Sequence, residues 1–315
     1  MSKQPTPDGM WQLQLQNKFS LLSSAEASPS MQSKSRSDPE QPKSNQGSVV
    51  LKDNESDKSK SLRVANLNID RGLIKKEDLL KYTIQEYNID IIGVSEVDLI
   101  DFDEKKPFKI EGFNTFFPLK RPGSNKKRHL CFVKEDLEVT QRSDLMSNSI
   151  SNVWLEMNTK SQKILICTMY REWNNLDGNG PLNTNQHSEN ILTLKAQIES
   201  AIKEGLVIVI GDMNIDIKKW DLPGISKTAE EYQLMIGECG LQMLDFGITW
   251  NRIIESVLKE SAIDHALTNK PEAVKDHFKV KFHRSDHDLI CVDVNFNVQK
   301  TVSYTHLTLP TNREV

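Results

Sequence analysis

Short apolar segments alternate with helical periods only in the middle of the chain, from about residue 62 to residue 297. Nearly continuous apolar runs at 89–95 and 206–210 are typical of strands that are covered on both faces. Other segments of strand length bear a weaker version of this signal. We expect these further strands at 62–69, 130–133, 153–157, 164–169, 266–267, 278–282 and 289–295.

Helical periodicity predicts three helices between these strands, over 78–87, after Ser188 and after Thr228. Thr228 and Glu231 have the spacing of a capping box, and Gly240 stands where a C-terminal cap belongs. The strands outnumber the helices, and many strands have one polar face. This pattern favours an α/β chain with two packed sheets and helices outside over a doubly wound parallel sheet.

The two flanks of this region lack its pattern. Residues 1–61 hold 14 Ser and 5 Pro and only short apolar clusters, which cannot offset the entropy of ordering, so we predict a disordered tail. After the domain at 62–297, residues 298–315 add no strand or helical stripe. The segment 301–315 resembles the translated adaptor of a cDNA library, and we interpret it as foreign to the domain.

Composition narrows the class of protein further. The 315 residues include 40 Lys and Arg against 44 Asp and Glu, a net charge of −4, so any phosphate-bearing partner must be held by a local site. The four cysteines are widely spaced without a CxxC pair, which indicates buried thiols in a reducing compartment. Neither a membrane span nor a signal pattern is present in this sequence, so we expect a nuclear or cytoplasmic protein that is not secreted and has no membrane partner.

Clusters of Asp, Asn, Glu and His recur where the expected strands end, which is where α/β folds place chemistry on loops held by a rigid sheet. Each cluster alone has a structural alternative, such as a solvated glutamate, an Asx turn or a surface His-Asp pair. The clusters are Asn68-Ile69-Asp70, Ser95-Glu96, Tyr170-Arg171-Glu172-Trp173, Gly211-Asp212-Met213-Asn214, Ile263-Asp264-His265 and Ser285-Asp286-His287-Asp288.

The residue types in these clusters suit phosphate chemistry. Glu96 follows an apolar strand, where a carboxylate is unfavourable without a cation, and the absence of a zinc-spaced Cys and His set favours a hard divalent ion. Gly211 is expected to let the chain turn tightly, so that Asp212 and Asn214 face the same side. His287, flanked by carboxylates, is expected to be a cation or a proton donor.

The six clusters occur in the order found in the endonuclease/exonuclease/phosphatase superfamily, which the chain resembles over 62–297. The resemblance implies a deoxyribonuclease-like four-layer sandwich with two packed mixed β-sheets flanked by helices. The Ser-x-Ile-Asp-His form at 261–265, the Tyr-Arg-Glu-Trp form at 170–173 and the stretch ending at Trp220 look most like endonuclease domains of non-LTR retrotransposons. A reverse transcriptase follows in those elements; this sequence has no Tyr-x-Asp-Asp fingerprint, so we interpret it as a truncated reading frame or a detached domain.

The resemblance assigns a metal set and a reaction set. Glu96 is implied as the principal Mg²⁺ ligand, Asn68 and Asp70 lie beside it, Asp286 supports the metal side, and Mn²⁺ is a possible substitute. The implied catalytic residues, with Asn68 counted here too, are Asp212 to orient or deprotonate the water, Asn214 to hold the scissile phosphate, His287 to contact a phosphate oxygen, Asp264 to orient His287, and Tyr170 to assist the phosphate or the leaving group.

A basic cluster at 120–129 is the strongest candidate for DNA contact outside the site. We predict a clamp on the phosphate backbone, with a solvated basic loop as the alternative. The glycine pair that the family often has before the strand at 130 is absent. The predicted DNA-binding residues are Lys120, Arg121, Lys126, Lys127 and Arg128, with Thr249 and Trp250 lining the site.

The leading hypothesis is a Mg²⁺-dependent DNA endonuclease that nicks one strand and leaves a 3′ hydroxyl. Alternatives on the same scaffold are an abasic-site repair nuclease, a deadenylase and an inositol-phosphate phosphatase. A decayed copy that binds DNA or a protein without catalysis is an alternative from another class. The expected partners are DNA and a reverse transcriptase domain of the parent element.

Overall fold

A computed structural model describes most of the predicted domain. The tail predicted for 1–61, apart from Ser61, and the segment 298–315 lie outside the described residues. The described residues are 61–100, 108–121, 126–160, 162–173, 182–220 and 223–295.

The described residues form two six-stranded mixed sheets with the strand orders β13-β14-β1-β2-β4-β3 and β5-β6-β7-β8-β12-β9. In the first sheet β1 and β2 are parallel, and in the second β7 and β8 are parallel. The first sheet contains β1 (Ser61–Asn68), β2 (Ile91–Ile100), β3 (Phe113–Phe116), β4 (Lys126–Lys134), β13 (Val274–Lys281) and β14 (Asp288–Asn295). The second contains β5 (Thr140–Gln141), β6 (Ser151–Asn158), β7 (Lys163–Tyr170), β8 (Leu206–Asp212), β9 (Gln242–Leu244) and β12 (Asp264–Thr268).

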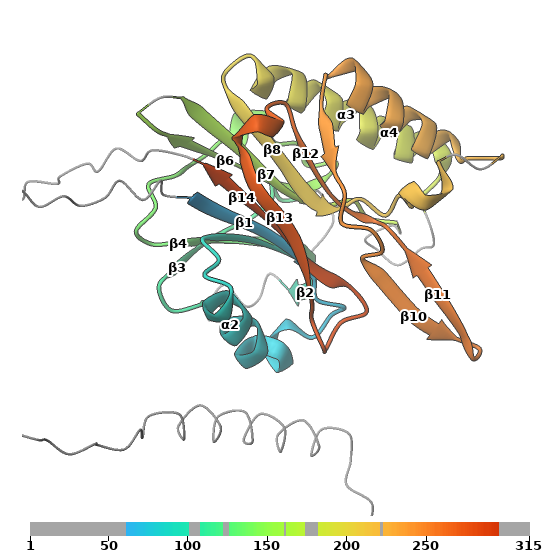
Figure 1. Ribbon diagram of the computed structural model, residues 1–315, viewed down its shortest axis with the longest axis horizontal. Coiled ribbons are helices and arrows are strands. Elements are labelled where there is room, and N and C mark those ends of the chain that lie inside the picture. The colour runs from blue at the N-terminus through green and yellow to red at the C-terminus, as the bar shows by residue number, and fades with distance from the viewer. Residues whose placement is uncertain are drawn as a thin grey trace, which may run out of the picture. The chain divides into compact units, whose positions relative to one another are not determined.

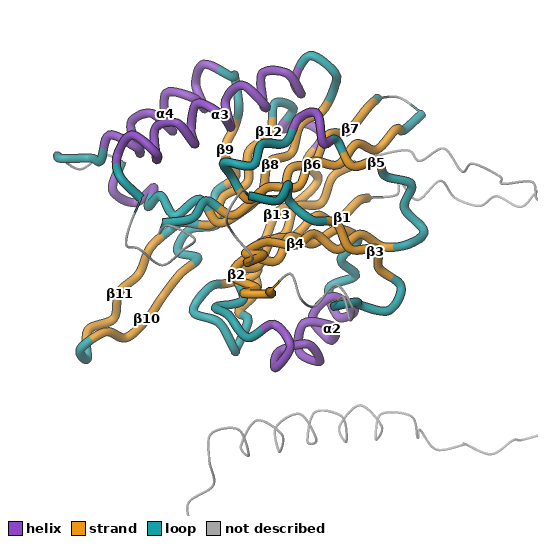
Figure 2. Tube along the Cα trace, turned by 180° about the vertical axis from the view of Figure 1, so that it is seen from behind, coloured by secondary structure: helices purple, strands orange, loops and turns teal. Residues whose placement is uncertain are grey.

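Three helices cover the outer faces of the sheets. Helix α2 (Glu77–Glu86) lies on the first sheet, and α3 (Thr184–Ile202) and α4 (Lys227–Glu238) lie together on the second (Figure 1). Figure 2 shows the same layers from behind, with the two sheets between the helices. The predicted four-layer sandwich is confirmed.

Strand alternation divides the apolar side chains among three layers of core. Leu62 and Val64 of β1 face the other sheet, whereas Ala65 and Leu67 belong to the cluster under α2. In β7, even-numbered residues such as Ile164 likewise join the core between the sheets, and their odd-numbered neighbours join the cluster under α3 and α4. Both faces of the central strands are therefore apolar, which explains the nearly continuous apolar runs in the sequence.

All the strands predicted from the sequence are present, and the helix boundaries bring two corrections. Helix α4 begins at Lys227 with Ser226 as its N-cap, so the capping box predicted at Thr228 and Glu231 is wrong; Gly240, at φ 61°, does follow the helix end. Helix α3 begins before Ser188, with a capping box made by Asn183 and Gln186. At both starts a side chain that accepts from a backbone N–H, Asn183 for α3 and Ser226 for α4, caps the helix.

Further corrections concern segments expected to be turns or loops. Gly211 lies inside β8, where a Cβ would stand 2.1 Å from the carbonyl oxygen of Met169, so it permits close strand approach and not a turn. Lys126, Lys127 and Arg128 belong to β4 and not to a loop.

A two-stranded hairpin that the sequence did not predict projects beside the second sheet (Figures 1 and 2). It consists of β10 (Trp250–Ile254) and β11 (Val257–Ser261), joined by Glu255 and Ser256, which both have positive φ. No helix in the described part of the chain has the length and apolar character needed to cross a membrane.

We expect Gly93→Ala to destabilise the domain and Gly237→Ala to stabilise it. A Cβ on Gly93 would lie 2.6 Å from Asn66 Oδ1 and 2.7 Å from Thr168 Cβ in the space between the sheets, and overpacking costs about 1 to 3 kcal/mol. Gly237 lies in α4 with no atom near its added Cβ, so the variant should gain about 0.5 kcal/mol from reduced chain entropy. Urea unfolding measures both changes, and equal stabilities would contradict the packing described.

Candidate active site

Predicted site residues from four strands meet at one end of the two sheets. Asn68 ends β1, Tyr170 ends β7 and Asp212 ends β8. The parallel pair β7 and β8 places Tyr170 beside Asp212, and antiparallel β12 begins with Asp264 directly opposite Asp212. A hydrogen bond of 2.9 Å from Asn68 Nδ2 to Asp212 Oδ2 joins the two sheets at this point.

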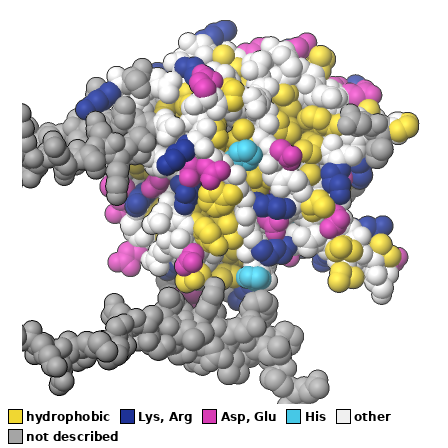
Figure 3. Space-filling view, in the orientation of Figure 1, with side chains coloured by type: hydrophobic (Ala, Val, Ile, Leu, Met, Phe, Trp, Pro, Cys, Tyr) yellow, Lys and Arg dark blue, Asp and Glu magenta, His cyan; other side chains and the backbone are white. Residues whose placement is uncertain are grey.

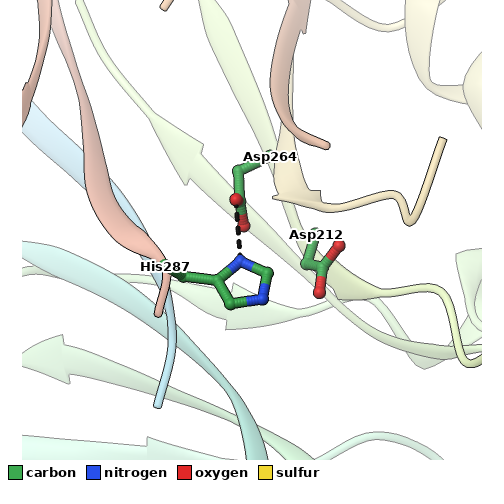
Figure 4. A group of neighbouring side chains, drawn as sticks. All are labelled: Asp212, Asp264 and His287. Carbon is green, nitrogen blue, oxygen red and sulfur yellow. Dashed lines mark hydrogen bonds and ion pairs between the residues drawn. The ribbon is translucent and has the colours of Figure 1, made fainter. Parts of the chain in front are cut away.

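His287 reaches the same point from the residue before β14. Its Nδ1 lies 2.9 Å from Asp264 Oδ2 (Figure 4). The Asp264 side chain is fully buried. Burial alone would lower the pKa of His287, but the carboxylates of Asp264, Asp212 and Asp286 together raise it to about 10. His287 is therefore a cation at neutral pH, held in orientation by Asp264.

Asp212 is completely buried beside this cation. Its two oxygens accept hydrogen bonds of 2.9 Å from Asn68 Nδ2 and from the backbone N–H of Asn214. Burial, followed by the proximity of Asp264, raises the pKa of Asp212 to about 7, although His287 acts in the opposite direction. A carboxylate that exchanges its proton near neutral pH is suited to general base catalysis.

Asp212, Asp264 and His287 bring one oxygen or nitrogen each within 4.8 Å of the others, which is close enough to surround a metal ion. Two observations favour acid and base chemistry by these residues over metal binding. A protonated imidazole has no lone pair for a metal, and its Nδ1 is already bound to Asp264. In this arrangement the three residues can transfer a proton and stabilise negative charge.

A second group of carboxylates, Asp70, Glu96 and Asp286, contains the metal ligands that the sequence predicts. Burial raises the pKa of Asp70, and the nearby charges of Asp286 and Glu96 raise it further. The charge of Lys76 acts in the opposite direction. Mutual repulsion of this kind is relieved by a hard cation with oxygen ligands. Asp70, Glu96 and Asp286 therefore remain the predicted ligands of a divalent ion, although their ligand atoms do not all lie within 4.8 Å of one another. Asn68 Oδ1 accepts a hydrogen bond from the backbone N–H of Asp70 at 2.9 Å.

Glu96 is held from two sides by residues of other strands. Tyr170 Oη donates to Glu96 Oε1 at 2.9 Å, and an Arg128 nitrogen lies 3.8 Å from Glu96 Oε2. Burial, with the charges of Glu96 and Asp212, raises the pKa of Tyr170, so its hydroxyl remains protonated. The structure thus places Arg128 within the site, where its side chain turns inward and does not extend from a DNA-binding loop as the sequence suggested.

The other predicted DNA-binding cations lie in three different surroundings. Lys120 and Lys126 are exposed. Arg121 pairs with the buried Glu172 at 2.8 Å, and the Lys127 ammonium lies 4.4 Å from the centre of the Phe117 ring. Acidic and basic side chains are interspersed on the face seen in Figure 3, in line with the balanced charge of the sequence.

Thr249 and Trp250 support the site carboxylates from behind. Thr249 is fully buried, and its hydroxyl accepts from the backbone N–H groups of Ile263 and Asp264, so the predicted DNA contact is wrong for this residue. The Trp250 indole N–H donates to Asp286 Oδ2 at 2.8 Å. Trp250 thus holds the carboxylate of Asp286, and Thr249 holds the backbone at Asp264.

Sequence reasoning missed Arg171 as a positioning residue. Its buried guanidinium donates to the carbonyl oxygen of Asn214 at 2.8 Å and to that of Met213. The Asn214 amide donates back to the Arg171 carbonyl at 2.9 Å, and Asn214 is held at φ 49°. The available signal was an arginine placed directly after a buried strand, where it must find buried acceptors.

The two mixed sheets thus bring an acidic edge and a His-Asp pair together at one end of the sandwich. The family described as "Endonuclease-reverse transcriptase" matches residues 164–291. This range includes Tyr170, Asp212, Asp264 and His287. Among the curated proteins no match was found.

Solved structures share the fold at low sequence identity. The endonuclease domain of TRAS1, a telomere-specific non-LTR retrotransposon, is 19% identical with a TM-score of 0.58, covering 76% of this chain and 100% of that one. The catalytic domain of Xenopus laevis APE2 is 16% identical, with a TM-score of 0.57 and coverage of 76% and 94%. D. rerio TDP2 complexed with a single-strand DNA product is 13% identical, with a TM-score of 0.50 and coverage of 75% and 99%.

The fold of the described residues is that of the endonuclease/exonuclease/phosphatase superfamily, so the resemblance seen in the sequence is confirmed. The family description names an endonuclease, which is in line with the predicted enzyme class, a hydrolase of phosphodiester bonds.

We expect Asp212→Asn to become more stable relative to the parent protein as the pH rises, when both are free of metal. The raised pKa means that the protonated Asp212 stabilises the fold, and this contribution disappears between about pH 4 and about pH 7. The amide carries no charge at any of these pH values. Thermal melting in EDTA should show the difference in Tm, variant minus parent, growing by a few degrees across this range. A difference independent of pH would contradict the raised pKa.

Proposed function

We propose that this protein is a Mg²⁺-dependent DNA endonuclease of the retrotransposon type that nicks one strand and leaves a 3′ hydroxyl. The observation that carries the proposal is the pairing of Asp212, with its pKa about 7, with the cationic His287 next to the carboxylates Asp70 and Glu96. Hydrolysis of a phosphodiester needs a base for water, positive charge for the phosphoryl oxygens and help for the leaving oxygen. The candidate site offers a residue for each need.

In this mechanism Asp212 accepts the proton of the attacking water, because it is ionisable near neutral pH and its carboxylate is fixed by Asn68 and Asn214. His287 stabilises the negative charge that develops on a non-bridging phosphate oxygen, and Asp264 keeps its ring oriented. Tyr170, kept protonated, would turn its one hydroxyl proton from Glu96 to the phosphate or the leaving oxygen. Asp70, Glu96 and Asp286 would hold the divalent ion, which supplies Lewis-acid stabilisation when bound, and Mn²⁺ is expected to substitute.

DNA as the substrate is supported by the relatives. The family description pairs an endonuclease with a reverse transcriptase, and the TRAS1 domain belongs to a non-LTR retrotransposon. The exposed Lys120 and Lys126 would contact the phosphate backbone. A reverse transcriptase of the parent element is the proposed protein partner, and action on DNA in the nucleus follows from the same function.

The full chain should convert supercoiled plasmid to open circles in the presence of Mg²⁺, and EDTA should stop the reaction. Glu96→Ala and His287→Ala should each lower the nicking rate at least about a hundredfold, because they remove a metal ligand and the phosphate-stabilising cation. Lys195→Ala, which removes an ion pair between α3 and Glu238 of α4 and no predicted site residue, is the control and should retain the parent rate. Nicking that survives both site substitutions would refute the proposal.

The chemistry of the nick separates this function from its alternatives. A polymerase should extend the nicked strand without prior phosphatase treatment, because the proposed cleavage leaves a free 3′ hydroxyl. Cleavage confined to duplexes that carry an abasic site would instead indicate a repair nuclease. DNA binding that is unchanged by EDTA and gives no cleavage would indicate a copy that has lost catalysis.

A further inference from the structure

A bulge in β2 places two acidic residues opposite a single residue of β4. Ser95 pairs with His129 and Leu99 pairs with Lys127, so Glu96, Val97 and Asp98 share the interval that faces Arg128. Glu96 and Asp98 have φ values of 54° and 51°, a left-handed conformation that is unfavourable for residues with a Cβ. Strain of this kind persists only where surrounding contacts hold the backbone in place.

Arg128 supplies contacts to both acidic residues of the bulge. Its Nε lies 3.1 Å from Asp98 Oδ1, and a terminal nitrogen lies 3.8 Å from Glu96 Oε2. The same terminal nitrogen donates to Tyr170 Oη at 3.2 Å, and the guanidinium carbon is 5.3 Å from the centre of the Tyr170 ring. Only 15% of the Arg128 side chain is exposed, so water screens these interactions weakly.

Both oxygens of Glu96 therefore face a partner within the protein. Tyr170 donates to Oε1, and the charge of Arg128 lies against Oε2. A divalent ion that binds Glu96 must approach the positive charge of the Arg128 guanidinium, which lies 3.8 Å from Oε2. The metal ion and the guanidinium would repel each other, and this repulsion is strong where water is partly excluded.

We propose that Arg128 is a positioning residue that orients Glu96 in the metal-free protein and competes with the divalent metal for its carboxylate. The inference rests on the proposed function, because it takes Glu96 as a metal ligand. When the metal binds, Asp98 and the face of the Tyr170 ring retain Arg128 beside the site. The charge of Arg128 thereby sets the metal concentration at which the site fills.

Isothermal titration of the full chain with Mn²⁺, without DNA, tests this competition. Arg128→Gln should bind Mn²⁺ about tenfold more tightly than the parent, since it removes a positive charge beside the ligand. Added KCl should reduce the difference, because salt screens the repulsion. Arg142→Gln is the matched control: Arg142 is likewise paired with carboxylates, three in its case against two for Arg128, and is 16% exposed. Its partners Asp144, Glu156 and Glu204 lie outside the site.

Two further measurements separate charge from folding. Arg128→Lys keeps the charge and should bind Mn²⁺ within about threefold of the parent. In EDTA, Arg128→Gln should melt below the parent, because the strained bulge loses its clamp, and saturating Mn²⁺ should narrow this gap. Equal tightening by Lys and Gln, or equal or weaker binding by the Gln variant, would overturn the proposal for Arg128 alone. A parent protein that binds no Mn²⁺ would refute the metal site of the proposed function together with it.

Discussion

The hydrogen bond between Asn68 and Asp212 is the interaction on which the candidate site depends, because it joins the two sheets where their chemistry meets. A fully buried carboxylate is unfavourable without donors, and Asp212 obtains one from each side: the Asn68 amide of the first sheet and the Asn214 backbone of the second. The same burial raises the pKa of Asp212 to about 7, and the cationic His287 offsets part of its penalty. The burial of Asp212 thus affects both the stability of the fold and the proton exchange of this carboxylate.

The strand-end positions of the site were accessible from the sequence, because buried strands leave apolar runs and the polar residues that follow them are conspicuous. Asn68, Asp212 and Asp264 are brought together as that reasoning expected. The same pattern also predicted which strands are covered on both faces. Once neighbouring strands pair, parallel or antiparallel, the polar residues at these strand ends lie at one edge of the sheets.

Orientation at irregular backbone was not accessible in this way. Arg128 was assigned to a basic loop, but a bulge in the neighbouring strand turns it toward two carboxylates, and bulges leave no composition signal. The hairpin of β10 and β11 was missed because Ile253 and Leu258 are apolar yet 72% and 57% exposed, so alternation gave no face to predict. Thr249 was misassigned since its partners are backbone groups, which no side-chain pattern reveals.

Because the candidate site is divided between two sheets, its activity depends on how the sheets stack. Asn68 and Glu96 come from one sheet, and Asp212 and Asp264 come from the other, so neither half of the sandwich contains a complete set. Strands that pair correctly within a sheet still leave an inert molecule unless the sheets stack in register. Catalytic competence is therefore a gauge of the assembled tertiary structure, one that secondary structure content alone does not provide.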